Sequence, residues 1–590
     1  MLPVLRSPNS VPKIKFWFLL GLTIFLHSLL LYRFFQLQIL DYDLYTERAN
    51  SNRIRATSIP APRGLILDRN GKIIVDNYPT YVLYGIEGEI VDKSRNFSVI
   101  SKATGIDTSY LSINYKNNFR NRFVPTKLAK DLTISQLSRL EEYKNDLTGI
   151  IYKQFPERIF NSKIRASHVL GYLKESDQEY LSSLSEKSDY QYGDLIGWSG
   201  LERNYESVLR GTKGVSYYQV DAFGREVGSV ENQSNILPKP GSDITTTLDI
   251  EIQELLESEF KGIKGAGIVS DPNTGGLLAY VSSPDYPPDL FTGLIATKDW
   301  ESVITNAEKP LLDRVANGTY PPGSIYKMIV GIELLERKLI NSSWEVSCPG
   351  YYEFYDRTFK CWKEKGHGKV NLEKAISESC DTFFYQAIQK VELDKLSERS
   401  KTFYHGMQTN IDLPSEMKGR VPDYKYMNKK YGRWGWSEGA MLNISIGQGE
   451  LLVTPLQITL YTNILATRGE TYPLHLVNNN YKKINGPNVS KKTWKFIEKA
   501  MIRVVNGSGG TGHRANPKIE GLIISGKTGT AENPHGEPHA WFVGFGRKDK
   551  ELISVVIMIE NGGHGGEVAA PIAKRIFKKY FESEIKIAKK

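Results

Sequence analysis

The pattern of apolar and polar positions separates a short apolar N-terminal stretch from a long mixed body. Residues 16–31 read FWFLLGLTIFLHSLLL and carry no charge. With residues 32–37 at the far interface, this stretch reaches the roughly 20 residues that a membrane-spanning helix needs. Basic residues precede it and acidic residues follow it, which predicts a cytoplasmic N-terminus and an external body. We predict a cytoplasmic tail over residues 1–15 and an uncleaved transmembrane signal-anchor over 16–37; a cleaved signal peptide and a soluble core helix are the alternatives.

The body divides at a proline- and glycine-rich segment, residues 237–241. Before it, Asn70-Gly71 follows a short apolar run and indicates a hairpin, and residues 128–143 have helical spacing. We expect a pedestal domain of the dimerisation type over residues 38–240, with mixed α/β structure. The C-terminal domain is expected over residues 241–585.

The C-terminal domain begins and ends with predicted strands, and helices dominate between them up to about residue 465. The strands are expected at 243–247, 267–270, 277–281, 522–525, 541–545 and 553–559, with helices over 249–260 and from about 570. This order favours an α+β domain whose C-terminal strands pair with the early ones in an antiparallel sheet flanked by helices.

Composition narrows the class of protein. The 590 residues include three cysteines, 24% charged residues and a net charge of +10. These values exclude a disulfide scaffold and a collagen, and the mean hydropathy of −0.36 excludes a multi-span membrane protein. No segment resembles a nucleic-acid-binding module, so no nucleic-acid partner is expected. A mildly basic surface suits an anionic lipid or an anionic cell-wall polymer.

Candidate chemistry begins at Ser324 and Lys327. Pro-Pro-Gly breaks the chain just before Ser324, and residues 325–335 have helical periodicity. Ser324 is therefore expected at a helix N-terminus, with Lys327 on the same helix face. A serine hydroxyl becomes a nucleophile when a base such as a desolvated lysine takes its proton. Alone, the motif is weak, since Ser-x-x-Lys also occurs at both ends of the chain.

Two further motifs follow in order. Ser379-Cys380-Asp381 lies 55 residues after Ser324, and Lys527-Thr528-Gly529-Thr530 lies 148 residues beyond Ser379, at the end of an apolar strand. Lys527 and Thr528 offer a cation and a hydroxyl to a carboxylate, and Gly529 permits close approach of a ligand to the backbone.

Together the three motifs resemble those of penicillin-binding proteins and serine β-lactamases. Residues 63–71 and 200–211 look like the N-terminal motifs of class B penicillin-binding proteins. Residues 348–385 look most like penicillin-binding protein 2, the elongation transpeptidase. The sequence departs from the commonest pattern at Asp381, where many relatives carry asparagine.

The resemblance implies a peptidoglycan D,D-transpeptidase that cross-links stem peptides through a serine acyl-enzyme and that β-lactams acylate. Ser324 is expected to attack, Lys327 to act as the base, and Ser379 and Asp381 to hold it. The terminal carboxylate is expected on Lys527, Thr528 and Thr530. The implied location is the bacterial inner membrane, with a periplasmic catalytic domain and no organic cofactor. The implied partners are a SEDS-family glycosyltransferase of the RodA type and other elongation-complex membrane proteins.

Other functions stay open at this point. A serine β-lactamase and a D,D-carboxypeptidase share the chemistry, although weak carboxypeptidase activity is also compatible with a transpeptidase. A division-type class B penicillin-binding protein is the nearest alternative, and a mainly non-catalytic activator of the glycosyltransferase is the alternative from another class.

The three cysteines fall within 33 residues. Cys348, Cys361, His367 and Cys380 have the ligand types of a closed tetrahedral zinc site, with Cys380 inside the second motif. The sequence favours a structural zinc that braces the catalytic loop. One disulfide with a spare thiol, or three buried small side chains, are the alternatives.

Overall fold

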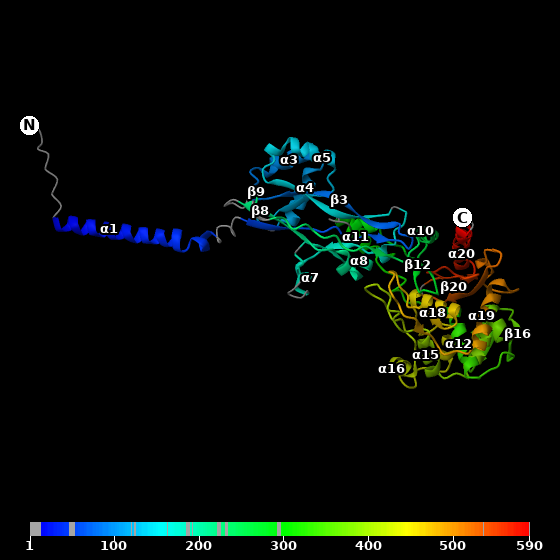
Figure 1. Ribbon diagram of the computed structural model, residues 1–590. Coiled ribbons are helices and arrows are strands. Elements are labelled where there is room, and N and C mark those ends of the chain that lie inside the picture. Colours follow the sequence, from blue (N-terminus) through cyan, green and yellow to red (C-terminus); the bar gives the residue numbers. More distant parts are fainter. Residues whose placement is uncertain are drawn as a thin grey trace, which may run out of the picture. The chain divides into compact units, whose positions relative to one another are not determined.

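The computed structural model of the 590-residue chain describes residues 13–46, 54–119, 121–122, 125–161, 163–183, 189–191, 193–220, 226–230, 234–291, 297–534 and 536–588 (Figure 1). Most of the predicted cytoplasmic tail, residues 1–12, lies outside the described residues. The described residues form two compact units.

The N-terminal apolar stretch forms helix α1 (Lys13–Phe35), which continues as a π-helical turn, η1 (Gln36–Leu40). Over Lys13–Leu40 the helix is long and apolar enough to cross a membrane, and none of its most apolar window is buried. Among the described residues it is the one helix with these properties. Its length follows from an unbroken run of apolar residues that no proline interrupts.

The first unit comprises residues 1–61, 79–155 and 212–239. It contains an antiparallel sheet of order β1-β8-β9 and a separate core formed by helices α3, α4 and α5 with β4. The bounds are β1 (Ile54–Ile59), β4 (Thr126–Ala129), β8 (Gly214–Val220), β9 (Glu226–Ser229), α3 (Lys93–Thr104), α4 (Thr108–Asn118), α5 (Ile134–Glu142) and η2 (Lys144–Asp146). Two long strands, β3 (Ile73–Gly85) and β5 (Ile150–Phe160), have residues in both units.

The predicted helix over residues 128–143 is wrong in its first part. Leu128 belongs to strand β4, and α5 begins only after Thr133, whose hydroxyl and Gln136 form a reciprocal capping box. The capping pair provides hydrogen-bond partners for helix-start amides that otherwise have none, so it fixes the helix start. The Asn70-Gly71 hairpin is confirmed, since β2 (Ile66–Leu67) pairs antiparallel with β3.

The second unit comprises residues 62–78, 156–211 and 240–590. Its centre is a five-stranded sheet of order β12-β11-β21-β20-β19, and every pairing in it is antiparallel. The predicted pairing of C-terminal strands with early strands is thus confirmed. The strands are β11 (Gly265–Ser270), β12 (Leu277–Ser283), β19 (Ile523–Ala531), β20 (His539–Lys548) and β21 (Glu551–Ile559).

Helices cover both faces of this sheet. Helices α10 (Ile250–Glu259) and α20 (Ala569–Ala588) pack on one face, and α18 (Pro455–Thr467) packs on the other, where Asn463 accepts hydrogen bonds from Ser270 and Ser554. In Figure 1, α20 lies above β20 and α18 below it. The sheet strands are buried along nearly their whole length, because helices remove both faces from water.

The remaining elements of the second unit are helices, two-stranded pieces and β10, which pairs parallel with β2 in the five-stranded sheet that also contains β3, β4 and β5. The helices are α6 (Ser167–Leu170), α7 (Gln178–Ser183), α8 (Gly200–Asn204), α9 (Glu206–Leu209), α11 (Thr297–Ile304), α12 (Lys327–Glu336), α13 (Leu372–Ser377), α14 (Asp381–Ile388), α15 (Leu393–Thr402), α16 (Tyr424–Tyr431), α17 (Gly439–Ser445) and α19 (Lys491–Asn506). The strands are β6 (Leu173–Glu175), β7 (Leu195–Gly197), β10 (Ile244–Thr245), β13 (Glu345–Cys348), β14 (Tyr351–Phe354), β15 (Arg357–Lys360), β16 (Gly368–Asn371), β17 (Glu470–Thr471) and β18 (Ile484–Asn485). Short 3₁₀ turns are η3 (Pro288–Phe291), η4 (Gly323–Tyr326) and η5 (His513–Ala515).

Strands β13 to β16 were not predicted, because the sequence indicated mainly helices up to residue 465. Each strand has only four residues, which is too short for a periodicity of two to stand out.

Candidate active site and cysteine cluster

The predicted nucleophile lies on a tight turn that leads into a buried helix. Ser324 is in the 3₁₀ turn η4, and Lys327 is the first residue of α12. Side chains three residues apart overlap in a 3₁₀ turn, so Ser324 and Lys327 face the same side. The helix is buried along most of its length, and its first residue, Lys327, has a fully buried side chain.

The Lys327 ammonium is held by the second motif. Its Nζ donates to Asp381 Oδ1 at 2.7 Å, to the Ser379 carbonyl at 2.9 Å and to Ser379 Oγ at 3.3 Å. All three protons of the ammonium therefore have acceptors, and the Asp381 carboxylate offsets its charge. The fold brings together residues 52 and 54 positions apart in the chain.

Lys527 approaches the same serine from strand β19. Its Nζ donates to Ser379 Oγ at 2.9 Å and to the Thr528 carbonyl at 2.8 Å. Burial, and after it the positive charge of Lys327, lowers the pKa of Lys527 well below the usual value of a lysine, while Asp381 acts in the opposite direction. The Ser379 hydroxyl thus lies between two lysine nitrogens, a position from which it can pass a proton between them.

Residues 379–381 form a strained turn at the start of α14. Ser379 has a φ of 58°, a left-handed conformation that is uncommon for residues other than glycine. Cys380 is the N-cap residue, and Asp381 is the first residue of the helix. A strained conformation of this kind persists only where surrounding contacts stabilise it. At Ser379 these contacts are the hydrogen bonds from Lys327 and Lys527.

Asp381 has a second partner that the sequence did not reveal. The backbone N–H of Trp362 donates to Asp381 Oδ2 at 3.0 Å, and the Trp362 indole donates to the Glu378 carbonyl at 3.0 Å. Both carboxylate oxygens of Asp381 therefore act as acceptors. An asparagine here would direct its NH₂ group at one of two donors, which gives a physical reason for aspartate in this chain.

Strand β19 lies against the nucleophile turn. A Cβ on Gly323, which has a φ of 56°, would lie 2.7 Å from the Thr530 carbonyl oxygen, so only glycine fits there. The Gln448 side chain donates to that carbonyl at 3.4 Å, and the Thr528 hydroxyl shares a 2.6 Å hydrogen bond with Thr511. Gly529 pairs with Trp541 of β20, whose indole donates to the Pro321 carbonyl just before the turn.

Gln448 and Thr511 were missed as site residues. Gln448 is flanked by Gly447 and Gly449, the one local signal that marked it. Thr511 is likewise flanked by Gly510 and Gly512, but its partner Thr528 is set only by the fold.

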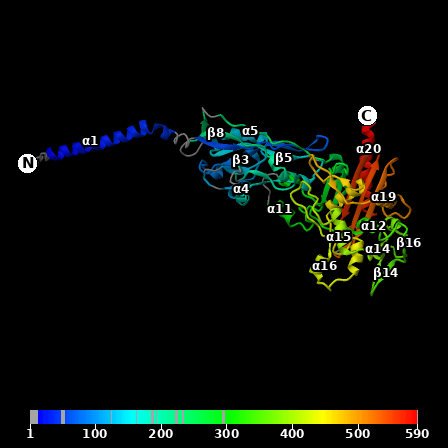
Figure 2. The same ribbon diagram turned by 60° about the horizontal axis from the view of Figure 1, so that its bottom comes forward.

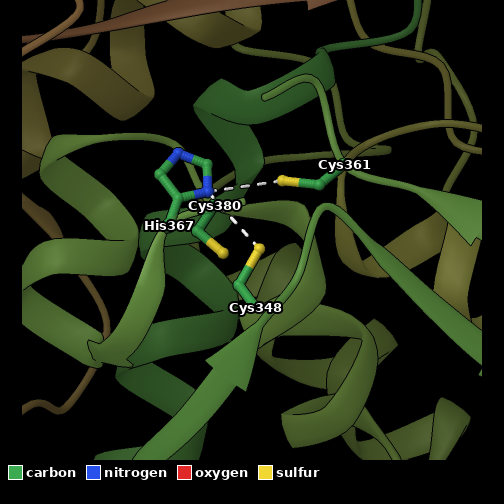
Figure 3. Close-up of side chains that lie close together, drawn as sticks. All are labelled: Cys348, Cys361, His367 and Cys380. Carbon is green, nitrogen blue, oxygen red and sulfur yellow. Dashed lines mark hydrogen bonds between the residues drawn. The ribbon is translucent and has the colours of Figure 1, made fainter. Parts of the chain in front are cut away.

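The four predicted metal ligands lie together (Figure 3). Their ligand atoms are within 4.8 Å of one another, and all four residues are buried. His367 Nδ1 is 3.5 Å from both Cys348 Sγ and Cys361 Sγ, and the three cysteines are free thiols. In a tetrahedral zinc site, a cysteine sulfur and a histidine nitrogen lie about 3.6 Å apart, so the spacing fits the metal.

Short elements supply these ligands. Cys348 ends β13 and pairs with Gly368 of β16, Cys361 follows β15, and Cys380 caps α14. The hydrogen bond from Cys380 is the largest cause that lowers the pKa of the Cys361 thiol. His367 Nε2 is buried without a hydrogen-bond partner among the described residues. Three thiols and one imidazole in a closed, buried cluster suit zinc rather than a hard cation.

Comparison with known proteins agrees with this geometry. Residues 265–578 match the family described as penicillin binding protein transpeptidase domain, and residues 58–246 match the penicillin-binding protein dimerisation domain. The chain is 32% identical to the peptidoglycan D,D-transpeptidase MrdA of Acinetobacter baumannii, over 97% of this chain and 88% of that protein. The chain belongs to the class B penicillin-binding proteins, in the penicillin-binding protein 2 group.

Solved structures share the fold of this penicillin-binding protein. The Helicobacter pylori penicillin-binding protein 2 in complex with MreC has a TM-score of 0.79 and 28% identity, covering 90% of this chain and all of that one. A chain of a peptidoglycan synthase complex that coordinates polymerization and crosslinking has a TM-score of 0.71 and 27% identity, over 96% of this chain and 98% of that one. The predicted fold class, an N-terminal helix, a pedestal domain and a penicillin-binding transpeptidase domain, is thus confirmed.

Proposed function

We propose that this protein is the peptidoglycan D,D-transpeptidase of cell elongation and that Ser324 is its nucleophile. The observation that carries the proposal is the hydrogen-bonded chain Lys327, Ser379 and Lys527, which joins the three motifs. The MrdA relatives and the penicillin-binding protein 2 structures support the elongation role.

In the proposed reaction, Ser324 Oγ bonds to the carbonyl carbon of the penultimate D-Ala of a stem peptide. The peptide bond to the terminal D-Ala breaks, and that residue leaves as the free amino acid. Lys327 takes the hydroxyl proton once one of its own protons has moved toward Ser379. At the other end of this path, Lys527 can accept a proton because its pKa is lowered. Ser379 then delivers a proton to the leaving amine.

The backbone N–H groups of Ser324 and Thr530 are proposed to form the oxyanion hole. Lys527, Thr528 and Thr530 are proposed to hold the terminal carboxylate, with Gly529 leaving room for the ligand. Once Lys527 has accepted a proton it is positively charged, and its buried surroundings, poor in water, then strengthen its attraction for the carboxylate. An amine from a neighbouring strand then attacks the ester and forms the cross-link, and a β-lactam acylates Ser324 in place of the stem peptide.

The cysteine cluster is proposed to bind one structural Zn²⁺ through Cys348, Cys361, His367 and Cys380. The metal would supply no step of the reaction. The four residues would hold the Trp362 amide and the Ser379–Asp381 turn in the positions that Lys327 requires.

We also propose the cellular setting. Helix α1 would anchor the chain once in the bacterial inner membrane, with residues 1–15 in the cytoplasm and the catalytic domain in the periplasm. The domain limits at 38–240 and 241–585 remain part of this proposal. The neighbours named above favour an MreC-type protein and a SEDS-family glycosyltransferase as partners.

Labelling with a fluorescent penicillin tests the nucleophile. The wild-type protein in detergent should be labelled covalently, and Ser324→Ala should fall to background, because the acyl bond needs the hydroxyl oxygen. Ser343→Ala, an exposed serine in the same domain, is the matched control and should label like the wild type. Equal labelling of Ser324→Ala would contradict the assignment.

A cross-linking assay with and without the glycosyltransferase separates enzyme from activator. Strands should be cross-linked by wild-type protein and not by Ser324→Ala. If polymerisation alone depended on the protein and no cross-links formed, the activator function would hold instead.

A further inference from the structure

We call the hydrogen-bonded group of Lys327, Ser379, Asp381 and Lys527 the catalytic network. Two segments next to it form one exposed surface rich in aromatic and basic side chains. We define this aromatic-basic surface as residues 351–365 and 424–438. Tyr355 donates to Glu438 at 3.4 Å, and a Cβ on Gly439 would touch the ring of Phe359 at 3.5 Å, so the segments lie side by side. In Figure 2, β14 and α16 lie at the same end of the second unit.

The rings on this surface project into water. Trp434 is 90% exposed, Tyr355 84% and Trp362 55%. Leaving large apolar rings in water forgoes the free energy that their burial would yield. Exposed aromatic side chains gathered on one surface are typical of a binding site.

The backbone of Tyr355 has an unusual, left-handed conformation. This residue occupies the first position of the two-residue loop between β14 and β15, where its φ is 52°. Glycine, asparagine or aspartate is usual at such positions, because a larger side chain is strained there. The hairpin thus holds a tyrosine outward at the cost of backbone strain, which points to a role for the ring.

The surface is also strongly basic. Its two segments contain eight lysine and arginine residues against four aspartate and glutamate residues. The Arg433 guanidinium lies 5.5 Å from the centre of the Trp434 ring. A protein-binding interface is usually depleted of charge at its centre, so this mixture of rings and cations favours a polymer with alternating neutral and anionic parts.

The surface begins at the catalytic network. Trp362 donates its amide to Asp381, and α17, which follows residue 438 directly, leads to Gln448 beside Thr530. Because Lys327 and Lys527 are fully buried, we expect them to meet only the end of a stem peptide and the rest of the substrate to lie outside them. Binding energy from such remote parts of a substrate positions the reacting end.

We infer that the aromatic-basic surface binds the glycan strand of the peptidoglycan substrate. The rings of Trp434 and Tyr355 stack on the flat C–H faces of the sugars, and Arg433 and neighbouring lysines pair with stem-peptide carboxylates. This inference rests on the proposed transpeptidase function, which supplies the polymer.

The test compares two ligands on the full-length protein in detergent. One is a set of fluorescently labelled, uncross-linked glycan strands with pentapeptide stems; the other is the free pentapeptide. Trp434→Ala should lower the ratio of strand affinity to pentapeptide affinity about tenfold, as expected for the loss of one stacked ring. Tyr355→Asn should also lower it, and asparagine tolerates the positive φ, so the hairpin keeps its shape.

Arg433→Gln should lower the ratio by a few fold and weaken its dependence on salt. Two matched controls should leave it unchanged. They are Lys492→Gln, which removes one exposed positive charge at the start of α19, and Tyr110→Ala, which removes an exposed ring from α4.

Three outcomes would overturn the inference. The first is that the ratio of strand affinity to pentapeptide affinity stays at the wild-type value in both ring variants. The second is that Lys492→Gln lowers this ratio as much as Arg433→Gln does. The third is that the ring variants lose binding to anionic lipid vesicles but keep their strand affinity. Penicillin labelling of the wild type distinguishes a failure of the strand-binding inference from a failure of the proposed transpeptidase function. A labelled protein with an unchanged ratio refutes only the strand-binding surface, whereas an unlabelled protein refutes the proposed function.

Discussion

The catalytic network and the cysteine cluster share one turn but are built in opposite ways. The network joins segments 55 and 148 residues apart and rests on α12, α14 and the central sheet. The cluster takes its four side chains from 33 residues. Cys348 ends a four-residue strand, Cys361 and His367 lie next to such strands, and Cys380 is the N-cap of α14. Two strands are rarely stable by themselves, so the proposed zinc would add order that these short strands lack.

The two sites are held in place by different interactions. The network is held by the hydrophobic core of the large domain, and burial in this core lowers the pKa of Lys527. The cluster connects to that network through the Trp362 amide and through Cys380, which lies between Ser379 and Asp381. If the proposed zinc is bound, its loss should disturb catalysis by moving the Trp362 amide and the Ser379–Asp381 turn, whereas substitutions in the network should act on the chemistry directly.

The largest expected effect is that of Lys527→Met. Penicillin acylation should fall by about 10³-fold, because the group that pairs with Ser379 and the substrate carboxylate is gone. Thermal stability should rise, by about 2–4 °C for each kcal/mol of relieved charge burial. Calorimetry and labelling on the same sample check both parts.

The stabilisation should depend on pH. A lysine whose folded pKa is lowered binds its proton less readily in the folded state, so the wild type loses stability as pH falls from about 10.5 toward that folded pKa. The gain in Tm from Lys527→Met should therefore be larger at pH 7 than at pH 10. An equal gain at both pH values would contradict the buried, depressed lysine.

The second largest effect is expected from loss of the proposed zinc. Cys361→Ser, or treatment with a strong chelator, should release one equivalent of zinc and lower the acylation rate about 10–100-fold. Limited proteolysis should then cut residues 345–371, while the central sheet stays intact. Lys369→Ala, which changes an exposed side chain in the same segment, should keep its zinc. Wild-type protein without zinc, fully active and with two of its thiols oxidised, would instead support a disulfide.

Asp381→Asn should have a smaller effect. The amide keeps the size of the side chain but turns one of its two acceptors into a donor that faces Lys327 or the Trp362 amide. We expect acylation to fall about tenfold, corresponding to roughly 1.4 kcal/mol. Glu398→Gln removes an exposed carboxylate from α15 and should not change the rate. A rate at the wild-type level would mean that the Trp362 contact does not orient Asp381.

The smallest expected effect is that of Thr511→Val. It leaves the Thr528 hydroxyl without its 2.6 Å partner, which should cost about 1 kcal/mol in stability and reduce acylation less than about fivefold. Thr511→Ser keeps the hydroxyl and should restore the wild-type rate. If the valine and serine variants behave alike, the methyl group rather than the hydrogen bond matters.

The sequence by itself determined the chemical groups and the main elements. Motif spacing selected Ser324, Lys327, Ser379 and Lys527, and apolar periodicity located α1 and the sheet strands, although β19 and β20 extend beyond their predicted ends. Local signals suffice there, because side-chain period and capping are properties of neighbouring residues. The helix over 128–143 and the missed strands β13 to β16 show where such signals are too short.

Only the tertiary structure decided how these groups meet. The placement of Ser379 between two lysines, the Trp362 amide on Asp381 and the contact of Thr511 with Thr528 all depend on segments far apart in sequence. The pairing of Tyr355 with Glu438, which defines the aromatic-basic surface, does so too. Such contacts are set by strand register and helix packing over the whole domain, and a local pattern of residues carries no record of them.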